Sequence, residues 1–255
     1  MDFLWYDEAI WNKDGDDEMV LNFAHRGSLT EAPENTIPAF QKALERGTKA
    51  IELDVQLTKD KQLVVCHDHK LTRFNKSSTT LIKDYTLEEI KQIDISGSFK
   101  DKYSGTTLPT LDEVLAICPK SILLNIEIKN IPVIYEGIER LLLDKLEEYN
   151  RLDQIIISSF DHVALKNVQD LNPSIPLGLL FHYRILQTWN YAENSDLNVY
   201  SIHPNHVYVD QEFVTKCKGK GYKVFPYTVN QKERYEELVE YGVDGVFSNN
   251  PDIFV

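Results

Sequence analysis

Eight short apolar runs, separated by amphipathic segments, restrict the folds open to this chain more than any other feature. A short apolar run between helix-like segments is typical of a buried parallel strand, and their alternation predicts βαβ units. Eight such units predict an α/β fold in which the sheet closes into a TIM-type (β/α)8 barrel. The runs are 20–24, 50–55, 122–128, 155–158, 177–181, 199–202, 224–227 and 245–247.

Apolar residues recur at helical spacing between most of these runs, so we expect helices there. The helical segments are 37–46, 133–149, 162–171, 211–218 and 232–241.

A ninth run, 63–66, follows the second strand after a short turn near Asp60. A parallel crossover needs about a dozen residues or more, so this run must fold back as an antiparallel hairpin. With the turn at Asp60, we expect His67 roughly opposite Glu52.

The stretch from about 70 to 111 interrupts the alternation with polar clusters and one short helical segment at 87–93. We interpret it as an insertion after barrel strand two. A chain of 255 residues with 42% hydrophobic content suits one α/β barrel as well as two small domains. The eight strand-like runs favour a single barrel domain over residues 1–255.

The formal net charge of −13 argues against a nucleic-acid-binding protein, because binding a polyanion requires an excess of Lys and Arg. A small phosphate-containing ligand remains compatible with this charge. A few cationic side chains and a bound metal can invert the electric field inside one cleft.

The three cysteines show no CxxC spacing and are odd in number, which favours neither a disulfide framework nor a zinc site. The N-terminal segment is acidic where a signal peptide would be basic, and no long uncharged apolar run follows. We therefore expect a cytoplasmic protein without a membrane span. Trp5, Tyr6 and Trp11 in this leader can cover the barrel bottom or form a subunit contact, and the oligomeric state stays open.

The motif His25-Arg26-Gly27 closes the first strand. Histidine transfers protons near neutral pH, and arginine grips phosphate with its forked donors. Glycine lets the backbone approach closely. This position is the catalytic face of a barrel, where the carboxyl ends of the strands meet.

Glu52 and Asp54 share one face of the second strand, and Glu127 and Lys129 share one face of the third. Three acids directed into one interior suggest a site for a hard cation such as Mg²⁺ or Ca²⁺. Salt bridges to lysines are the alternative for the acids. Lys129 can offset charge on a phosphate or form an ion pair.

His67-Asp68-His69 follows the hairpin, and alternation predicts that His67 and His69 share a side while Cys66 packs away from it. Two histidines converging on three acids favour catalysis over packing. His182, His203 and His206 fall near predicted strand ends, where they can reach the rim, but surface or packing roles are favoured for them.

Together these motifs resemble the glycerophosphodiester phosphodiesterase family from about residue 23 to residue 251. The matching motifs, in order, are His25-Arg26-Gly27, Pro33-Glu34-Asn35-Thr36, Glu52-Leu53-Asp54-Val55, His67-Asp68, Glu127-Ile128-Lys129, Ser159-Phe160 and Thr228-Val229-Asn230.

The resemblance implies a TIM-type barrel with a segment inserted between strands two and three. It implies that Glu52, Asp54 and Glu127 bind one divalent cation, Mg²⁺ or Ca²⁺. It also implies that His25 and His67 form the acid/base pair.

For the substrate, the resemblance implies that Arg26 and Lys129 contact the phosphate, and that Phe160 and Tyr227 contact the organic part. The implied reaction is hydrolysis of a small glycerophosphodiester to an alcohol and glycerol 3-phosphate, in glycerol and lipid metabolism. The neighbouring glycerol hydroxyl would attack first, giving a cyclic phosphate that water opens. A phospholipase-like phosphodiesterase, of lyso-phospholipase D or phosphoinositide type, is the alternative.

Three positions depart from the family pattern. Tyr227 stands where tryptophan is frequent, Lys61 where glycine follows aspartate, and Ser248-Asn249-Asn250-Pro251 lacks an acid near the end. We expect these departures to affect substrate preference, the hairpin turn and the rim respectively, and to leave the chemistry untouched.

Overall fold

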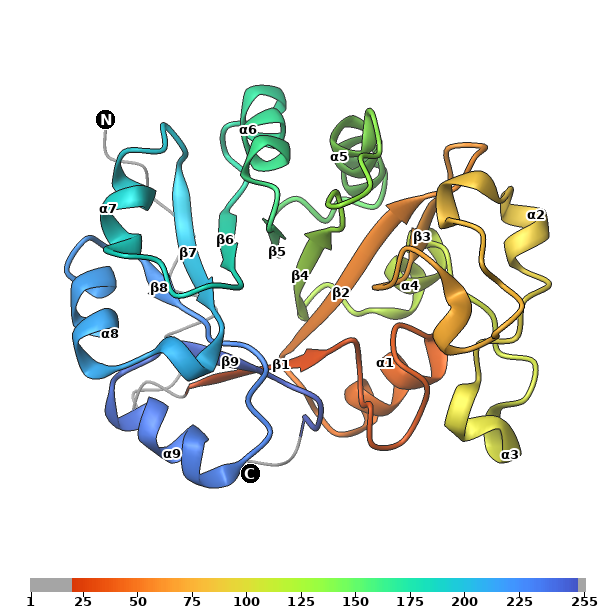
Figure 1. Cartoon of the computed structure of the whole chain (residues 1–255), viewed down its shortest axis with the longest axis horizontal. Coiled ribbons are helices and arrows are strands. Elements are labelled where there is room, and N and C mark those ends of the chain that lie inside the picture. The colour runs from red at the N-terminus through yellow and green to blue at the C-terminus, as the bar shows by residue number, and fades with distance from the viewer. Residues whose placement is uncertain (1–19, 252–255) are drawn as a thin grey trace.

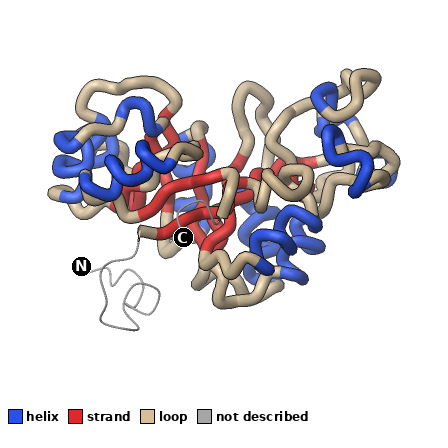
Figure 2. The backbone as a smooth tube through the Cα atoms, turned by 90° about the horizontal axis from the view of Figure 1, so that it is seen from below, coloured by secondary structure: helices blue, strands red, loops and turns tan. Residues whose placement is uncertain are grey.

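The computed structural model describes residues 20–251, and the acidic leader with Trp5, Tyr6 and Trp11 lies outside that range. Eight parallel strands surround the interior, and helices cover them on the outside (Figure 1). Viewed from below, the strands gather at the centre with helices on both sides (Figure 2). The predicted (β/α)8 barrel is confirmed.

The hydrogen-bonded order of the barrel strands is β8-β7-β6-β5-β4-β2-β1-β9. Backbone hydrogen bonds from Asp244 to Val224 (3.1 Å) and from Phe247 to Pro226 (3.0 Å) join the two end strands and nearly close the ring. The strands are β1 (Leu21–His25), β2 (Ala50–Leu57), β4 (Leu123–Ile128), β5 (Ile155–Ser159), β6 (Leu177–Phe181), β7 (Val199–Pro204), β8 (Lys223–Val224) and β9 (Gly245–Ser248).

Strand β8 is shorter than the run 224–227 from which it was expected. Pro226 lies within that run and has no backbone N–H to donate to a ladder. The Pro226 carbonyl still accepts a hydrogen bond from the Phe247 amide, so this segment remains part of the barrel wall.

The helices between the strands each bury one apolar face against the sheet. Helix α5 begins later than residue 133, because Gly137 adopts a left-handed conformation (φ +83°) directly before it. The outer helices are α1 (Ile37–Glu45), α4 (Leu111–Ile117), α5 (Ile138–Glu148), α6 (His162–Leu171), α7 (Thr188–Glu193), α8 (Gln211–Lys218) and α9 (Lys232–Glu240).

Alternation along the strands divides the molecule into two apolar layers. Ile51, Leu53 and Val55 of β2 point outward into the core shared with the helices. Ala50, on the opposite face, joins an interior cluster with Phe23 of β1 and residues of four other segments. The inward positions nearer the carboxyl ends of β1 and β2 are polar, and they form the site described below.

The hairpin expected after β2 is present. Strand β3 (Leu63–Val65) pairs antiparallel with β2, with Val65 opposite Val55 and Leu63 opposite Leu57. Extended further, this register would place His67 beside Leu53, one residue from the rough pairing with Glu52 that was expected. Lys61 takes φ +60° in the turn, at the position where the family pattern has glycine.

The inserted segment packs against the outer side of this hairpin (Figure 1). It holds α2 (Leu87–Ile90), α3 (Lys100–Tyr103) and the 3₁₀ turns η1 (Leu71–Arg73), η2 (Ile82–Asp84) and η3 (Gly97–Phe99), while a fourth turn, η4 (His206–Tyr208), follows β7. Leu71, Ile82 and Ile90 form a small core with Val64 and Cys66 of the hairpin. Thr110 caps α4 through a reciprocal capping box and marks the end of the insertion.

Within residues 20–251, no helix combines the length and apolar character needed to cross a membrane.

The contact between β6 and β7 gives a test of the barrel packing. A Cβ atom at Gly178 would lie 2.5 Å from the ring of His203, which is fully buried and held by Ser201 through a 2.7 Å hydrogen bond. We expect Gly178→Ala to lower the free energy of unfolding by about 1–3 kcal/mol, as overpacking does, measured by urea denaturation. The loss should shrink in a His203→Ala background, and an equal loss in both backgrounds would contradict the steric explanation.

Candidate active site

Three carboxylates converge inside the carboxyl end of the barrel. Glu52 and Asp54 occupy alternate positions of β2, and the parallel register places Glu127 of β4 directly beside Asp54. One oxygen from each side chain lies within 4.8 Å of the others. All three residues are buried, with exposures of 3%, 0% and 8%.

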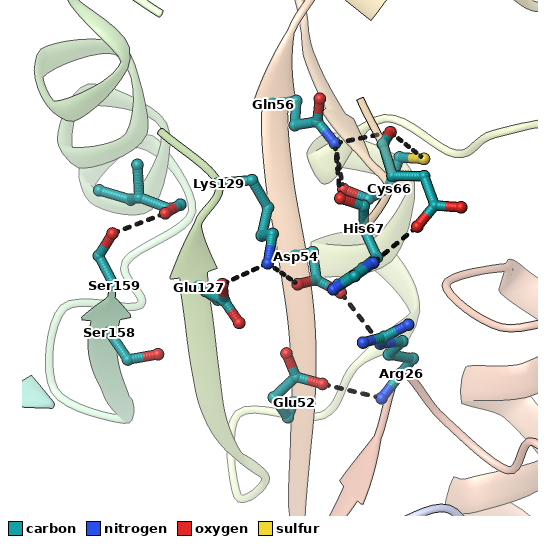
Figure 3. Close-up of polar contacts among 12 residues, drawn as sticks. Arg26, Glu52, Asp54, Gln56, Cys66, His67, Glu127, Lys129, Ser158 and Ser159 are labelled. Atoms are coloured by element: carbon teal, nitrogen blue, oxygen red, sulfur yellow. Dashed lines mark hydrogen bonds and ion pairs between the residues drawn. The ribbon is translucent and has the colours of Figure 1, made fainter. Parts of the chain in front are cut away.

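Arg26 and Lys129 are the cations beside these carboxylates (Figure 3). Lys129 Nζ lies 2.6 Å from a Glu127 oxygen and 3.8 Å from Asp54 Oδ1, and Arg26 Nε lies 3.4 Å from Asp54 Oδ2. The Arg26 amide donates to Glu52 Oε2 at 2.9 Å. The sequence left open whether the acids face one another around a shared site or form salt bridges. In the structure they do both, because they converge and also pair with Arg26 and Lys129.

The turn after β1 makes the position of Arg26 possible. Arg26 and Gly27 both have positive φ angles, 59° and 89°. A Cβ atom at Gly27 would lie 2.6 Å from the backbone of Ala39 in α1, so only glycine lets the turn pack this closely.

The electrostatics of the three acids differ. Burial raises the pKa of Glu52, and the negative charge of Asp54 adds to this rise. Burial also raises the pKa of Glu127, against the opposing charge of Lys129. For Asp54 burial acts in the same direction, but the charges of Arg26 and Lys129 outweigh it and hold the pKa below its usual range. Burial and the charge of Asp54 therefore both disfavour a negative charge on Glu52 and on Glu127.

The donor set fits a hard divalent cation. Asp54 Oδ1 is buried and has no hydrogen-bond partner among the described residues, and the same holds for Asn125 Oδ1. Asn125 lies opposite Glu52 in the sheet and lines the same cavity. Carboxylate and amide oxygens are the ligands that Mg²⁺ and Ca²⁺ prefer, and a cation would also relieve the repulsion among the acids.

His25 and His67 line one cavity of about 270 Å³ together with Arg26, Glu52 and Glu127. Burial, with the nearby charge of Arg26, lowers the pKa of His25 to about 4, so this ring is neutral at pH 7. The structure thus brings together on one cavity the two histidines singled out by the sequence. His69 is not part of that cavity lining.

The Nδ1 atom of His25 lies 2.7 Å from Asn249 Oδ1, an interaction that the sequence did not predict. Asn249 is itself held by a hydrogen bond from its amide to Asn230 Oδ1 at 2.9 Å. The departure at residues 248–251, which was expected to concern the rim, therefore includes a residue that contacts one of the two histidines. Asn249 thus orients the His25 ring through Nδ1, and the other ring nitrogen, Nε2, points toward Glu52, whose Oε2 lies 3.9 Å away.

His67 and His69 do not share a side, contrary to the alternation expected. Strand β3 ends at Val65, so the strand period no longer applies to the residues after it. His67 Nδ1 lies 2.7 Å from Asp68 Oδ1, whereas the His69 ring is bound by Gln56, Tyr135 and the carbonyl of Ile131. Cys66 is buried in the small core of the insertion, as predicted.

Aromatic side chains form one wall of the cavity. The Phe160 ring lies 5.8 Å from the Tyr227 ring, and Lys129 Nζ lies 5.5 Å from the Phe160 centroid. Tyr227 is fixed by a hydrogen bond from its hydroxyl to the Phe181 carbonyl at 2.9 Å. His182, for which a surface or packing role was favoured over a place at the rim, also lines this cavity.

Glu34 and Asn35 complete the surroundings of the acids. Asn35 Nδ2 donates to Asp54 Oδ2 at 2.8 Å, and Glu34 Oε1 accepts from Arg26 Nη1 at 2.9 Å. Thr36, the next residue, caps α1 and fixes where this segment leaves the site. The motif Pro33-Glu34-Asn35-Thr36 was the signal for these contacts, although no role had been assigned to it.

Comparisons with known proteins identify the family of this chain. The model of the Glycerophosphoryl diester phosphodiesterase family matches residues 25–253. The chain is 42% identical over 237 residues to a glycerophosphodiester phosphodiesterase from Caldanaerobacter subterraneus subsp. tengcongensis, covering 92% of this chain and 96% of the relative. It is 34% identical to a glycerophosphodiester phosphodiesterase from Bacillus subtilis, covering 93% and 86%.

Among solved structures, a phosphodiesterase from Oleispira antarctica in complex with the product sn-glycerol-3-phosphate is similar to this chain. The TM-score is 0.80 at 32% identity, and the match covers 92% of this chain and 94% of the other. The chain belongs to the glycerophosphoryl diester phosphodiesterase family. It is an enzyme of the phosphoric diester hydrolase class.

The buried acids give a prediction about stability. Without a cation, Glu52→Gln should raise the free energy of unfolding near pH 7 by about 1 kcal/mol, since an uncharged amide avoids burying a charge. Because the raised pKa of Glu52 reflects a disfavoured charge, this gain should disappear as the pH falls and Glu52 becomes protonated.

Urea denaturation with and without Mg²⁺ or Ca²⁺, at several pH values, measures both effects. The wild-type protein should be stabilised by the cation, as any ligand of the native state does, and the variant should lose most of that stabilisation. A variant that is less stable without the cation and equally stabilised by it would contradict the proposed site.

Proposed function

We propose that this enzyme hydrolyses glycerophosphodiesters to an alcohol and sn-glycerol 3-phosphate, with one Mg²⁺ or Ca²⁺ bound by Glu52, Asp54 and Glu127. The convergence of these buried carboxylates beside two histidines is the observation that carries the proposal. The sn-glycerol-3-phosphate complex of the similar Oleispira antarctica enzyme supports the glycerol part of the substrate.

A bound divalent cation would supply positive charge to the phosphate oxygens and lower the repulsion toward an incoming nucleophile. Arg26 and Lys129 add two fixed charges at the same place, and arginine can bind two phosphate oxygens at once. These residues hold the phosphate between the two histidines. The reacting groups are therefore already oriented, which lowers the entropic cost of reaching the transition state.

The two histidines exchange protons with the substrate in two steps. In the first, one histidine takes the proton of the neighbouring glycerol hydroxyl, whose oxygen forms a new bond to phosphorus. The other histidine donates a proton to the leaving alcohol as its bond to phosphorus breaks, which leaves a cyclic phosphate. In the second step water opens this ring, and the histidines act in reversed roles.

The wall formed by Phe160 and Tyr227 faces the organic part of the substrate in this arrangement. Tyr227 carries a hydroxyl, but the hydroxyl is already bound to the Phe181 carbonyl. The wall therefore presents mainly aromatic faces to the glycerol or head-group carbons. We further propose a cytoplasmic enzyme, for which the three buried free cysteines are suited.

Release of glycerol 3-phosphate from the choline, ethanolamine and glycerol diesters tests this function. We expect hydrolysis with Mg²⁺ or Ca²⁺, loss of activity with chelator and recovery when either cation is returned, because the acids cannot substitute for the missing positive charge. Full activity in excess chelator, or release of the phosphorylated alcohol in place of glycerol 3-phosphate, would contradict the proposal.

The two cavity histidines and His69 form a matched set of variants. His25→Ala and His67→Ala should each lower kcat by about 10²–10⁴-fold, the usual contribution of general acid or base catalysis. His69→Ala should lower kcat much less, because the His69 ring is bound by Gln56, Tyr135 and Ile131 away from the cavity. Steady-state kinetics measure these effects. If the His69 variant were inactive and the His67 variant active, His69 and not His67 would be the second acid/base residue.

A further inference from the structure

Arg73 is the last residue of η1 in the insertion and lies outside the cavity lining. It contacts two acids, each of which contacts a residue that lines the cavity. Its Nε donates to Asp68 Oδ2 at 2.7 Å. Its Nη1 and Nη2 donate to the two oxygens of Glu34 at 2.6 and 2.7 Å. One guanidinium group therefore joins two acids that are 34 residues apart in the chain.

Each of these acids continues to a different residue of the cavity. Asp68 Oδ1 lies 2.7 Å from His67 Nδ1. Glu34 Oε1 accepts from Arg26 Nη1 at 2.9 Å, and Arg26 in turn pairs with Asp54. Two short chains of contacts, Arg73–Asp68–His67 and Arg73–Glu34–Arg26, start from the same side chain.

The geometry differs from that of an ordinary surface ion pair, which contributes little to stability. Arg73 donates to Glu34 in a bidentate arrangement and to Asp68 through a third nitrogen, so its planar fork fixes both acids relative to each other. Glu34 is largely covered, with 11% of its side chain exposed. A lysine could supply one charge at this place but could not span both acids.

We propose that Arg73 is a positioning residue, which sets the distance and orientation of His67 relative to Arg26 and so couples the inserted segment to the reaction at the barrel centre. This inference rests on the proposed roles of His67 and Arg26. Neither residue alone fixes that spacing, because His67 lies just beyond the hairpin and Arg26 lies on a turn with positive φ. The insertion thus contributes to catalysis although it lends no side chain to the cavity wall.

The test compares Arg73→Gln and Arg73→Lys with Arg46→Gln as a matched control. Arg46 makes a similar two-contact pair with Glu31, at 3.0 and 3.1 Å, and is as exposed as Arg73, 49% against 46%. Arg73→Gln should lower kcat/KM on the order of 10- to 100-fold, the scale of a misplaced catalytic group. Arg73→Lys should be intermediate, and Arg46→Gln should change kcat/KM by less than about twofold.

Two further readouts separate positioning from a merely structural role. Added guanidinium should restore part of the turnover of Arg73→Ala, because the exposed site is open to solvent, and urea should not. Asp68→Asn should lower kcat more than it raises KM, and Arg73→Gln added to it should cost less than the product of the single losses. Fully multiplicative losses, or equal effects at Arg73 and Arg46, would overturn the inference.

The ring nitrogen NMR signals of His67 test the same link without substrate. Arg73→Gln should shift them and Arg46→Gln should leave them in place, and unchanged signals in both variants would overturn the inference. A wild-type enzyme that hydrolyses no glycerophosphodiester would overturn the proposed function instead, and the NMR result would still decide whether Arg73 orients His67.

Discussion

The repulsion among three buried carboxylates is the constraint on which the rest of this site depends. Glu52, Asp54 and Glu127 face one another because a parallel register places alternate residues of β2 and β4 side by side. Arg26 and Lys129 supply two positive charges to three acids. Burial, with the negative charge of Asp54 acting in the same direction, raises the pKa values of Glu52 and Glu127. A divalent cation bound there, as we propose, would add positive charge and relieve the repulsion among the acids.

Contacts extend outward from these acids and make the carboxyl end of the barrel one connected polar structure. Arg26 joins Asp54 to Glu34, Glu34 joins Arg73, and Arg73 returns through Asp68 to His67. The amino end of the barrel interior is apolar by contrast, with three phenylalanine rings in contact. The apolar layer at the amino end therefore stabilises the barrel. The polar layer at the carboxyl end carries the candidate catalytic side chains, whose positions are set by the strands.

Strand alternation made much of this predictable. Apolar runs between amphipathic segments placed the eight strands, and the period of two along a strand gave the faces of Glu52, Asp54, Glu127 and Lys129. It failed where the strand ended, since alternation cannot show that β3 stops at Val65 and that His67 and His69 diverge. The contacts of Asn249 and Arg73 were also missed, because both depend on side chains that meet only after the ring closes and the insertion packs. Tertiary contacts between distant segments leave no local pattern in a single sequence.

The most direct measurement of the central claim is the anomalous diffraction of crystals soaked in Mn²⁺, which replaces Mg²⁺ or Ca²⁺ at oxygen sites and scatters anomalously. A cation site at these acids predicts one strong peak among Glu52, Asp54 and Glu127, at about 2.0–2.6 Å from an oxygen of each, on the same side as His25 and His67. A map with no peak there, with Lys129 and Arg26 still filling the space between the acids, would contradict a metal-dependent site.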